Sequence, residues 1–171
     1  MSLIRCTGKL LREMGLKPSS NAADQALSGQ LGSWHANLIY IDRRKTVLFV
    51  NDKTLFNFIA PDVPRAQVRE LSTLFAFWLS CVLSDEGFGE SAKAEILGEY
   101  KDVLCAPTNN RHVLGSMNDL ALHYKYFVIE GGGIHSPEVP GIIRKLNRMP
   151  FAAIGYRLPI ELLRDLYETA T

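Results

Sequence analysis

The residues best suited to chemistry lie in one helical segment that follows Thr108. At 100° per residue, four polar side chains share a narrow band opposite the apolar stripe: His112, Ser116, Asp119 and His123. Asp119 and His123 are four residues apart, so the carboxylate could orient the imidazole for acid–base chemistry. Any surface helix shows a polar band to solvent, however, and this plainer interpretation is favoured. A metal site would need further ligands, and we expect neither a metal nor a cofactor.

The start of this helix is a possible anion site. Asn109 or Asn110 can cap it, and Arg111 stands beside the free backbone amides at the positive end of the helix dipole. A phosphate or carboxylate would suit this position, although ordinary capping explains the same residues. Gly115 and Asn118 share a further band with Arg111. A glycine inside a helix indicates the close approach of another backbone or of a ligand, and backbone packing is the commoner reason.

A β-hairpin gathers a second polar group. Two strand-like stretches, residues 34–41 and 46–51, flank a basic turn predicted over residues 42–45. With that turn, His35 should lie opposite Asp52, as a carboxylate–imidazole dyad or, more simply, as an ordinary cross-strand pair. The open end of the hairpin then collects four polar side chains: His35, Asn37, Asn51 and Asp52.

Composition and charge narrow the class of protein. The chain has 171 residues, and its 47% hydrophobic and 22% charged content is typical of a folded globular domain. We therefore expect one domain over residues 1–171. A formal net charge of +1 gives no strong nucleic-acid signal. The three cysteines lack metal-ligand spacing, so we expect reduced, mostly buried thiols in the cytoplasm. No apolar run approaches a membrane span.

The remaining pattern predicts an α+β fold, with a small, mainly antiparallel sheet packed against several helices. Residues 3–6 and 102–106 read as strands, and residues 17–33 read as a long surface loop. Gly131 to Gly133 read as a flexible helix terminator. Further helices are predicted over residues 8–14, 53–59, 65–83, 88–100 and 137–148, and from Pro159 onward.

Three stretches of the chain carry a resemblance: Arg5-Cys6-Thr7, Trp34-His35-Ala36-Asn37-Leu38, and Val113-Leu114-Gly115-Ser116-Met117-Asn118-Asp119. They resemble a prokaryotic domain family that is catalogued only as being of unknown function. The resemblance covers nearly the whole chain. It implies a cytoplasmic domain that occurs alone, and it implies no activity, cofactor or catalytic residue. The family pattern leads us to expect serine at position 112, which argues against a site built on His112.

Two functional hypotheses follow. The first is a binding or regulatory domain for a protein partner, which would contact the basic turn at Arg43-Arg44-Lys45, or for a small anionic ligand, which would be held by Asn37, Asn51, Asn110, Arg111 and Asn118. The second is a small phosphate-handling enzyme, a phosphodiester hydrolase or phosphoryl-transfer enzyme. It would bind phosphate at the helix start and move protons with His35, Asp52 or Asp119. The absence of any established catalytic motif favours the first hypothesis. Both require the hairpin's open end to lie beside the start of the Arg111 helix.

Overall fold

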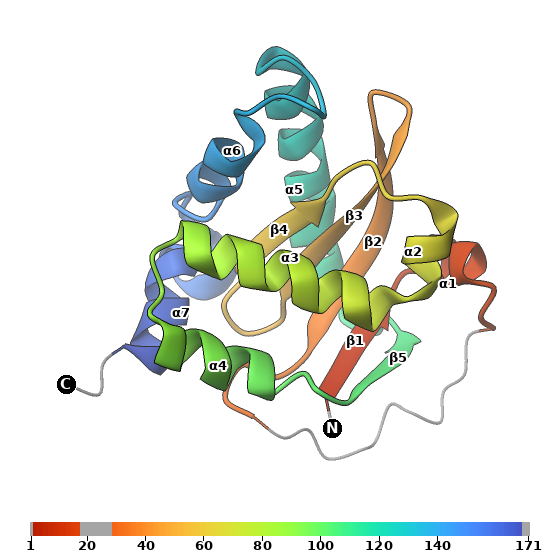
Figure 1. Ribbon diagram of the computed structural model, residues 1–171. Coiled ribbons are helices and arrows are strands. Elements are labelled where there is room, and N and C mark those ends of the chain that lie inside the picture. The colour runs from red at the N-terminus through yellow and green to blue at the C-terminus, as the bar shows by residue number, and fades with distance from the viewer. Residues whose placement is uncertain (1, 18–28, 169–171) are drawn as a thin grey trace.

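The computed structural model describes residues 2–17 and 29–168 (Figure 1). Most of the loop predicted over residues 17–33 therefore lies outside the described residues. In the part described, seven α-helices accompany one five-stranded sheet with the strand order β4-β3-β2-β1-β5. This arrangement confirms the predicted α+β fold class.

The sheet is mixed, and most of its paired residues belong to antiparallel ladders. β1 (Ser2–Cys6) runs parallel to both of its neighbours, β2 (Trp34–Ile41) and β5 (Val103–Pro107). β2 pairs antiparallel with β3 (Arg44–Asn51), which pairs antiparallel with β4 (Asn57–Ala60). The prediction of a mainly antiparallel sheet is confirmed, and the parallel pairs place the ends of β1 and β5 side by side.

One face of the sheet is covered by α3 (Leu71–Asp85), which crosses in front of the strands in Figure 1. Trp34, Phe49 and Phe58 project toward Phe75 of α3, with ring centroids 5.2, 5.3 and 5.9 Å from the Phe75 centroid. All four rings are fully buried. Rings packed edge-on and tilted in this way contribute beyond the apolar area they bury, so this cluster is the centre of the core.

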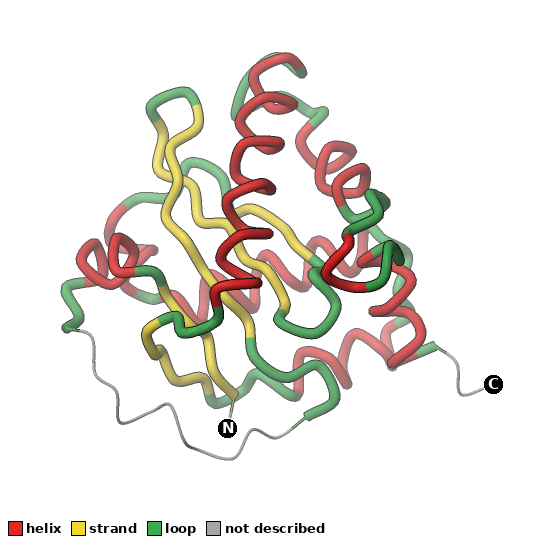
Figure 2. Tube along the Cα trace, turned by 180° about the vertical axis from the view of Figure 1, so that it is seen from behind, coloured by secondary structure: helices red, strands yellow, loops and turns green. Residues whose placement is uncertain are grey.

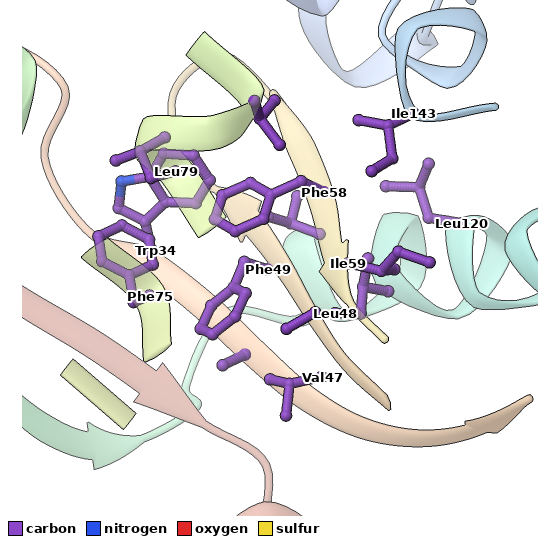
Figure 3. Close-up of a cluster of buried hydrophobic side chains, with 14 of the residues drawn as sticks. Trp34, Val47, Leu48, Phe49, Phe58, Ile59, Phe75, Leu79, Leu120 and Ile143 are labelled. Atoms are coloured by element: carbon purple, nitrogen blue, oxygen red, sulfur yellow. The ribbon is translucent and has the colours of Figure 1, made fainter. Parts of the chain in front are cut away.

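The opposite face is covered by α5 (Arg111–Glu130), which lies in front of the strands in Figure 2. Figure 3 shows Ile59 of β4 against Leu120 of α5 and Ile143 of α6 (Val139–Leu146). These three side chains are buried. Because side chains alternate along a strand, His35 and Asn37 point to this second face, beneath α5, while Trp34 points to the first.

The hairpin turn is tighter than the four-residue turn predicted over residues 42–45. Only Asp42 and Arg43 form it, with φ of 51° and 62°. Two left-handed residues are the geometry of a type I′ turn, whose twist matches that of the flanking strands. The predicted pairing of His35 with Asp52 is therefore wrong, since His35 pairs with Val50. The shift is two residues, so every side chain keeps its predicted face.

Replacing the turn residues with Asp42→Asn and Arg43→Gly should stabilise the protein. Both positions adopt a backbone conformation that non-glycine residues rarely favour, and Asn-Gly is the preferred sequence for this turn. We expect a gain of about 0.5–1 kcal/mol in urea unfolding. Arg44→Gly, one residue into β3, is the control and should destabilise. Equal effects of Arg43→Gly and Arg44→Gly would contradict this account of the turn.

Residues 53–59 do not form the predicted helix. The Asn51 side chain accepts hydrogen bonds from the backbone amides of Lys53 and Thr54 at 3.0 and 2.9 Å, which starts a turn. Leu55 then takes φ of 56°, which ends any helical path. The following residues, 57–60, form the edge strand β4 instead, because its hydrogen bonds to β3 replace those a helix would supply.

The other helices lie close to their predicted positions. The helix predicted over residues 65–83 is divided into α2 (Arg65–Arg69) and α3 at Glu70, whose ψ of 54° is not helical. Residues 151–154 contain a short 3-10 helix, η2 (Ala152–Ile154). The rest are α1 (Gly8–Met14), α4 (Glu90–Gly98) and α7 (Pro159–Tyr167). None of the helices described is long and apolar enough to span a lipid bilayer.

Candidate functional site

The open end of the hairpin lies against the start of α5, as both functional hypotheses require. Asp52 directly follows β3, and Asn110 is the N-cap of α5. The Asn110 side-chain amide donates a hydrogen bond to the Asp52 carboxylate, with Nδ2 and Oδ1 3.3 Å apart. This contact joins two segments that are 58 residues apart in the sequence.

The parallel strands explain why α5 begins here. Thr108, just after β5, donates its backbone amide to the Cys6 carbonyl at the end of β1, at 3.2 Å. Asn110 then caps the helix, because its Oδ1 accepts from the amides of His112 and Val113 at 3.0 and 3.3 Å. The cap occupies amides that an anion would otherwise bind, so the helix start alone is not an open phosphate site.

His35 is the most unusual residue of the site. Its side chain is 0% exposed, and neither ring nitrogen has a hydrogen-bond partner in the part of the chain described. Nε2 lies 3.8 Å from Asp52 Oδ1, which is too long for a hydrogen bond. Burial lowers the pKa of His35 to about 4, while Asp52 opposes this shift and Arg5 adds to it. The imidazole is therefore neutral at pH 7, with a buried donor and a buried acceptor both unsatisfied.

Arg5 is a second buried group with too few partners, and sequence reasoning missed it. It lies on β1 beside His35 in the parallel ladder and is only 8% exposed. Its one hydrogen bond joins Nη1 to the Pro107 carbonyl at 3.4 Å, and no carboxylate within residues 2–17 and 29–168 pairs with it. A guanidinium has five donors and is normally paired when buried. An arginine within an otherwise apolar strand was the available signal.

A cavity of about 390 Å³ lies next to Asp52, which forms part of its lining, whereas His35 and Arg5 lie behind this lining. Asp52 and Asn110 form one wall, and the next two turns of α5 and the 3-10 helix η2 form others. The cavity is lined by Asp52, Lys53, Leu55, Asn110, His112, Val113, Ser116, Ala153 and Ile154. Its volume is typical of a small-molecule site, and its lining comes from three separate segments, two of which supply polar side chains.

Several predicted ligand-binding residues serve the scaffold instead. Asn51 is fully buried, and its amide donates to the carbonyls of Leu31 and Ser33 at 2.9 and 3.3 Å. Together with the turn it starts at Lys53, these bonds leave it no capacity for a ligand. Asn37 accepts a hydrogen bond from the Thr7 hydroxyl at 2.8 Å, which ties β2 to the start of α1.

The polar band of α5 divides between two environments. His112 and Ser116 line the cavity, whereas Asn118 and Asp119 are exposed on the outer surface. Asp119 makes no ion pair with His123 among the residues described, and the His123 ring instead stacks against Phe127, with centroids 6.2 Å apart. The structure therefore does not use Asp119 to orient an imidazole.

Two further positions at the start of α5 face solvent. Arg111 is exposed next to the cap. Gly115 is also exposed, and a Cβ built on it would meet nothing within 4 Å. Within the chain described here, no backbone packs closely against Gly115, so this expected reason for the glycine is wrong.

The arrangement suits binding better than acid–base catalysis. A histidine whose pKa is about 4 carries a proton in only about one molecule in a thousand at pH 7, so His35 is a poor general acid. Its burial also keeps it from solvent water. The cavity lining itself offers the second oxygen of Asp52 and the polar side chains of Asn110, His112 and Ser116.

Comparison with known proteins places the chain in a family. A family model described as a domain of unknown function (DUF6933) matches residues 3–162, so the chain belongs to that family. No match to a curated protein was found. The family description assigns no activity, and the function must therefore be inferred from the site.

Proposed function

We propose that this member of the family is a small-ligand binding domain, a single unit over residues 1–171, that works in a prokaryotic cytoplasm. The ligand is a small anion that also carries a hydroxyl or amino group. It enters the cavity beside Asp52 and the first turns of α5. The observation that carries this proposal is a pair of buried, under-bonded groups behind the cavity lining: His35, whose Nε2 is 3.8 Å from Asp52 of that lining, and Arg5, its neighbour on β1.

The charge of the ligand follows from Arg5. A buried cation without a carboxylate partner is costly, and the nearby N-terminus of α5 adds positive potential. An anion would compensate both. Arg111, exposed beside the Asn110 cap, is placed to steer an anion toward the mouth of the cavity.

The Asp52 carboxylate indicates that the ligand carries a hydrogen-bond donor. Only one of its oxygens accepts from Asn110, and this carboxylate faces the cavity. A hydroxyl or amino group on the ligand would give it a second partner. A small movement of Asp52 would also close the 3.8 Å gap to Nε2 of His35 and satisfy the buried imidazole. Ligand binding would thereby order the whole polar cluster.

Calorimetric titration at pH 7 tests the proposal with inorganic phosphate, malate, glutamate and ribose 5-phosphate as probes. We expect at least one probe that has both an anionic and a donor group to bind. Arg5→Met and His35→Phe should each weaken binding at least tenfold. Both variants should also gain stability without ligand, by about 1–2 kcal/mol, because each removes a buried polar group that lacks partners.

Arg12→Met is the matched control, because Arg12 is an exposed arginine on α1. It should leave binding and stability unchanged. The proposal fails if no probe binds the wild type, or if binding survives in both Arg5→Met and His35→Phe. Marked destabilisation by Arg5→Met would show that the guanidinium is a structural group and would remove the argument for an anion.

A further inference from the structure

A second cavity lies between α3 and α6, beside the residue that follows β4, and it differs in character from the polar one. Its volume is about 400 Å³, and it lies between the second half of α3, the loop before α6, and α6 itself. Figure 1 shows α6 beside the end of α3. It is lined by Pro61, Trp78, Cys81, Val82, Asp85, Ile134, His135, Ser136, Pro137, Val139, Pro140 and Ile143.

The walls of this cavity are firmly held. Val82, Ile134 and Ile143 belong to the buried core and present only an edge to the cavity. The glycine run that precedes the loop ends α5, as predicted from the sequence, with Gly131 as the C-cap of the helix. Gly133 donates its amide to the Val128 carbonyl at 2.8 Å, a bond that closes the end of α5.

Two more contacts fix the same loop. The Ser136 hydroxyl donates to the Gly131 carbonyl at 2.6 Å and accepts from the Glu138 amide at 3.1 Å. A Cβ on Gly131 would approach Cδ1 of Ile142 to 3.3 Å, so the end of α5 also packs closely against α6. The cavity is therefore preformed, and a ligand would bind without ordering its walls.

The charged groups at its rim already have partners. Asp85 forms an ion pair with Arg144. His135 Nε2 lies 3.2 Å from Asp62 Oδ2. Neither group leaves an uncompensated charge for a ligand to neutralise, in contrast to Arg5 at the polar site. The interior surface is otherwise aliphatic and aromatic, with the half-buried Trp78 ring as one wall.

We propose that this cavity is a separate binding site for a neutral, largely apolar small molecule of about one or two rings. A preformed concave site of this volume, with apolar walls and polar groups only at the rim, matches the general character of small-molecule pockets. The site does not depend on the anion-binding proposal, since no residue lines both cavities.

Cys81 provides a direct way to test this site. We expected mostly buried cysteines, yet Cys81 is exposed and lines the cavity, whereas Cys6 is buried and Cys105 half-buried. 6-Propionyl-2-(dimethylamino)naphthalene, a neutral two-ring probe whose emission shifts to the blue in apolar surroundings, should bind with a dissociation constant on the order of 10 µM. Cys81→Trp should fill the cavity and weaken binding at least tenfold.

Ser72→Trp is the matched control, because it adds the same ring to an exposed position of α3 outside the cavity. It should bind the probe like the wild type. Saturating probe should also slow the alkylation of Cys81 by iodoacetamide at least fivefold, as measured by peptide mass spectrometry, and leave Cys105 unaffected.

Three results would overturn the proposal. One is the absence of saturable probe binding below about 1 mM, far weaker than a filled pocket of this size supports. Another is equal probe affinity in Cys81→Trp and Ser72→Trp. The third is a wild-type dimer in size-exclusion chromatography with light scattering that Cys81→Trp, but not Ser72→Trp, dissociates. That last result would make this surface an interface between copies of the chain.

Discussion

Lowering the pH from 6.5 to 4 should remove about 3 kcal/mol of folding stability through His35 alone. The pKa of His35 falls from its ordinary 6.5 to about 4 in the folded protein, chiefly because the ring is buried. The unfolded chain therefore binds a proton more readily than the folded one. The free-energy cost of protonating the buried ring is small at pH 6.5, grows as the pH falls through this window, and approaches its full value below about pH 4.

Urea unfolding of matched variants separates His35 from the carboxylates that titrate in the same range. The control variant is His123→Gln, which changes a histidine whose ring stacks on Phe127 of α5. Its free energy of unfolding should fall in parallel with that of the wild type on acidification. His35→Phe should lose about 3 kcal/mol less over the same window. Identical slopes in wild type and His35→Phe would mean that the imidazole is not held neutral by burial.

Asn147→Ala should destabilise the protein by about 3 kcal/mol, because it leaves two buried backbone groups without partners. β4 is the edge strand of the sheet, and the Asn147 side chain pairs with its outer side as a neighbouring strand would. Nδ2 donates to the Asn57 carbonyl at 2.7 Å, and Oδ1 accepts from the Asn57 amide at 2.9 Å. Both residues are fully buried.

Thermal and urea denaturation of Asn147→Ala check this prediction, with the exposed Asn118→Ala as a control that should stay within about 0.5 kcal/mol of wild type. Tyr124→Phe offers a second, smaller test, since the Tyr124 hydroxyl donates to the Asn57 side chain at 2.6 Å. A loss below about 1 kcal/mol in Asn147→Ala would show that water replaces the side chain at this edge.

Local sequence signals predicted the elements whose structure is set locally. The helix predicted over residues 8–14 matches α1, since the Thr7 hydroxyl at its start accepts from the Leu10 amide and Gly15 at its end has φ of 74°. The prediction of a helix over residues 53–59 was wrong because the structure of these residues depends on a non-local interaction. The cap-like start at Asn51 is real, but pairing with β3 decides the conformation of residues 57–60, and no local pattern encodes that pairing.

The neighbourhood of the site was predictable, and the roles of its residues were not. The polar ends of the hairpin and of α5 were expected to meet, and Asp52 contacts Asn110 as that expectation required. Asn51 and Asn110 have the residue type of ligand-binding groups, but their hydrogen bonds are used within the fold. Arg5 became visible only through tertiary structure, because its lack of partners is a property of the packed protein.

The binding claim is tested most directly by nuclear magnetic resonance of the His35 imidazole during titration with the anionic probe that binds most tightly. We predict that the His35 ring nitrogens and the Asn110 side-chain amide shift together and saturate at the calorimetric dissociation constant. The exposed ring of His135, which does not line this cavity, should not follow them. If the probe saturates the protein while His35 and Asn110 stay unshifted, the anion binds elsewhere and the proposed site is wrong.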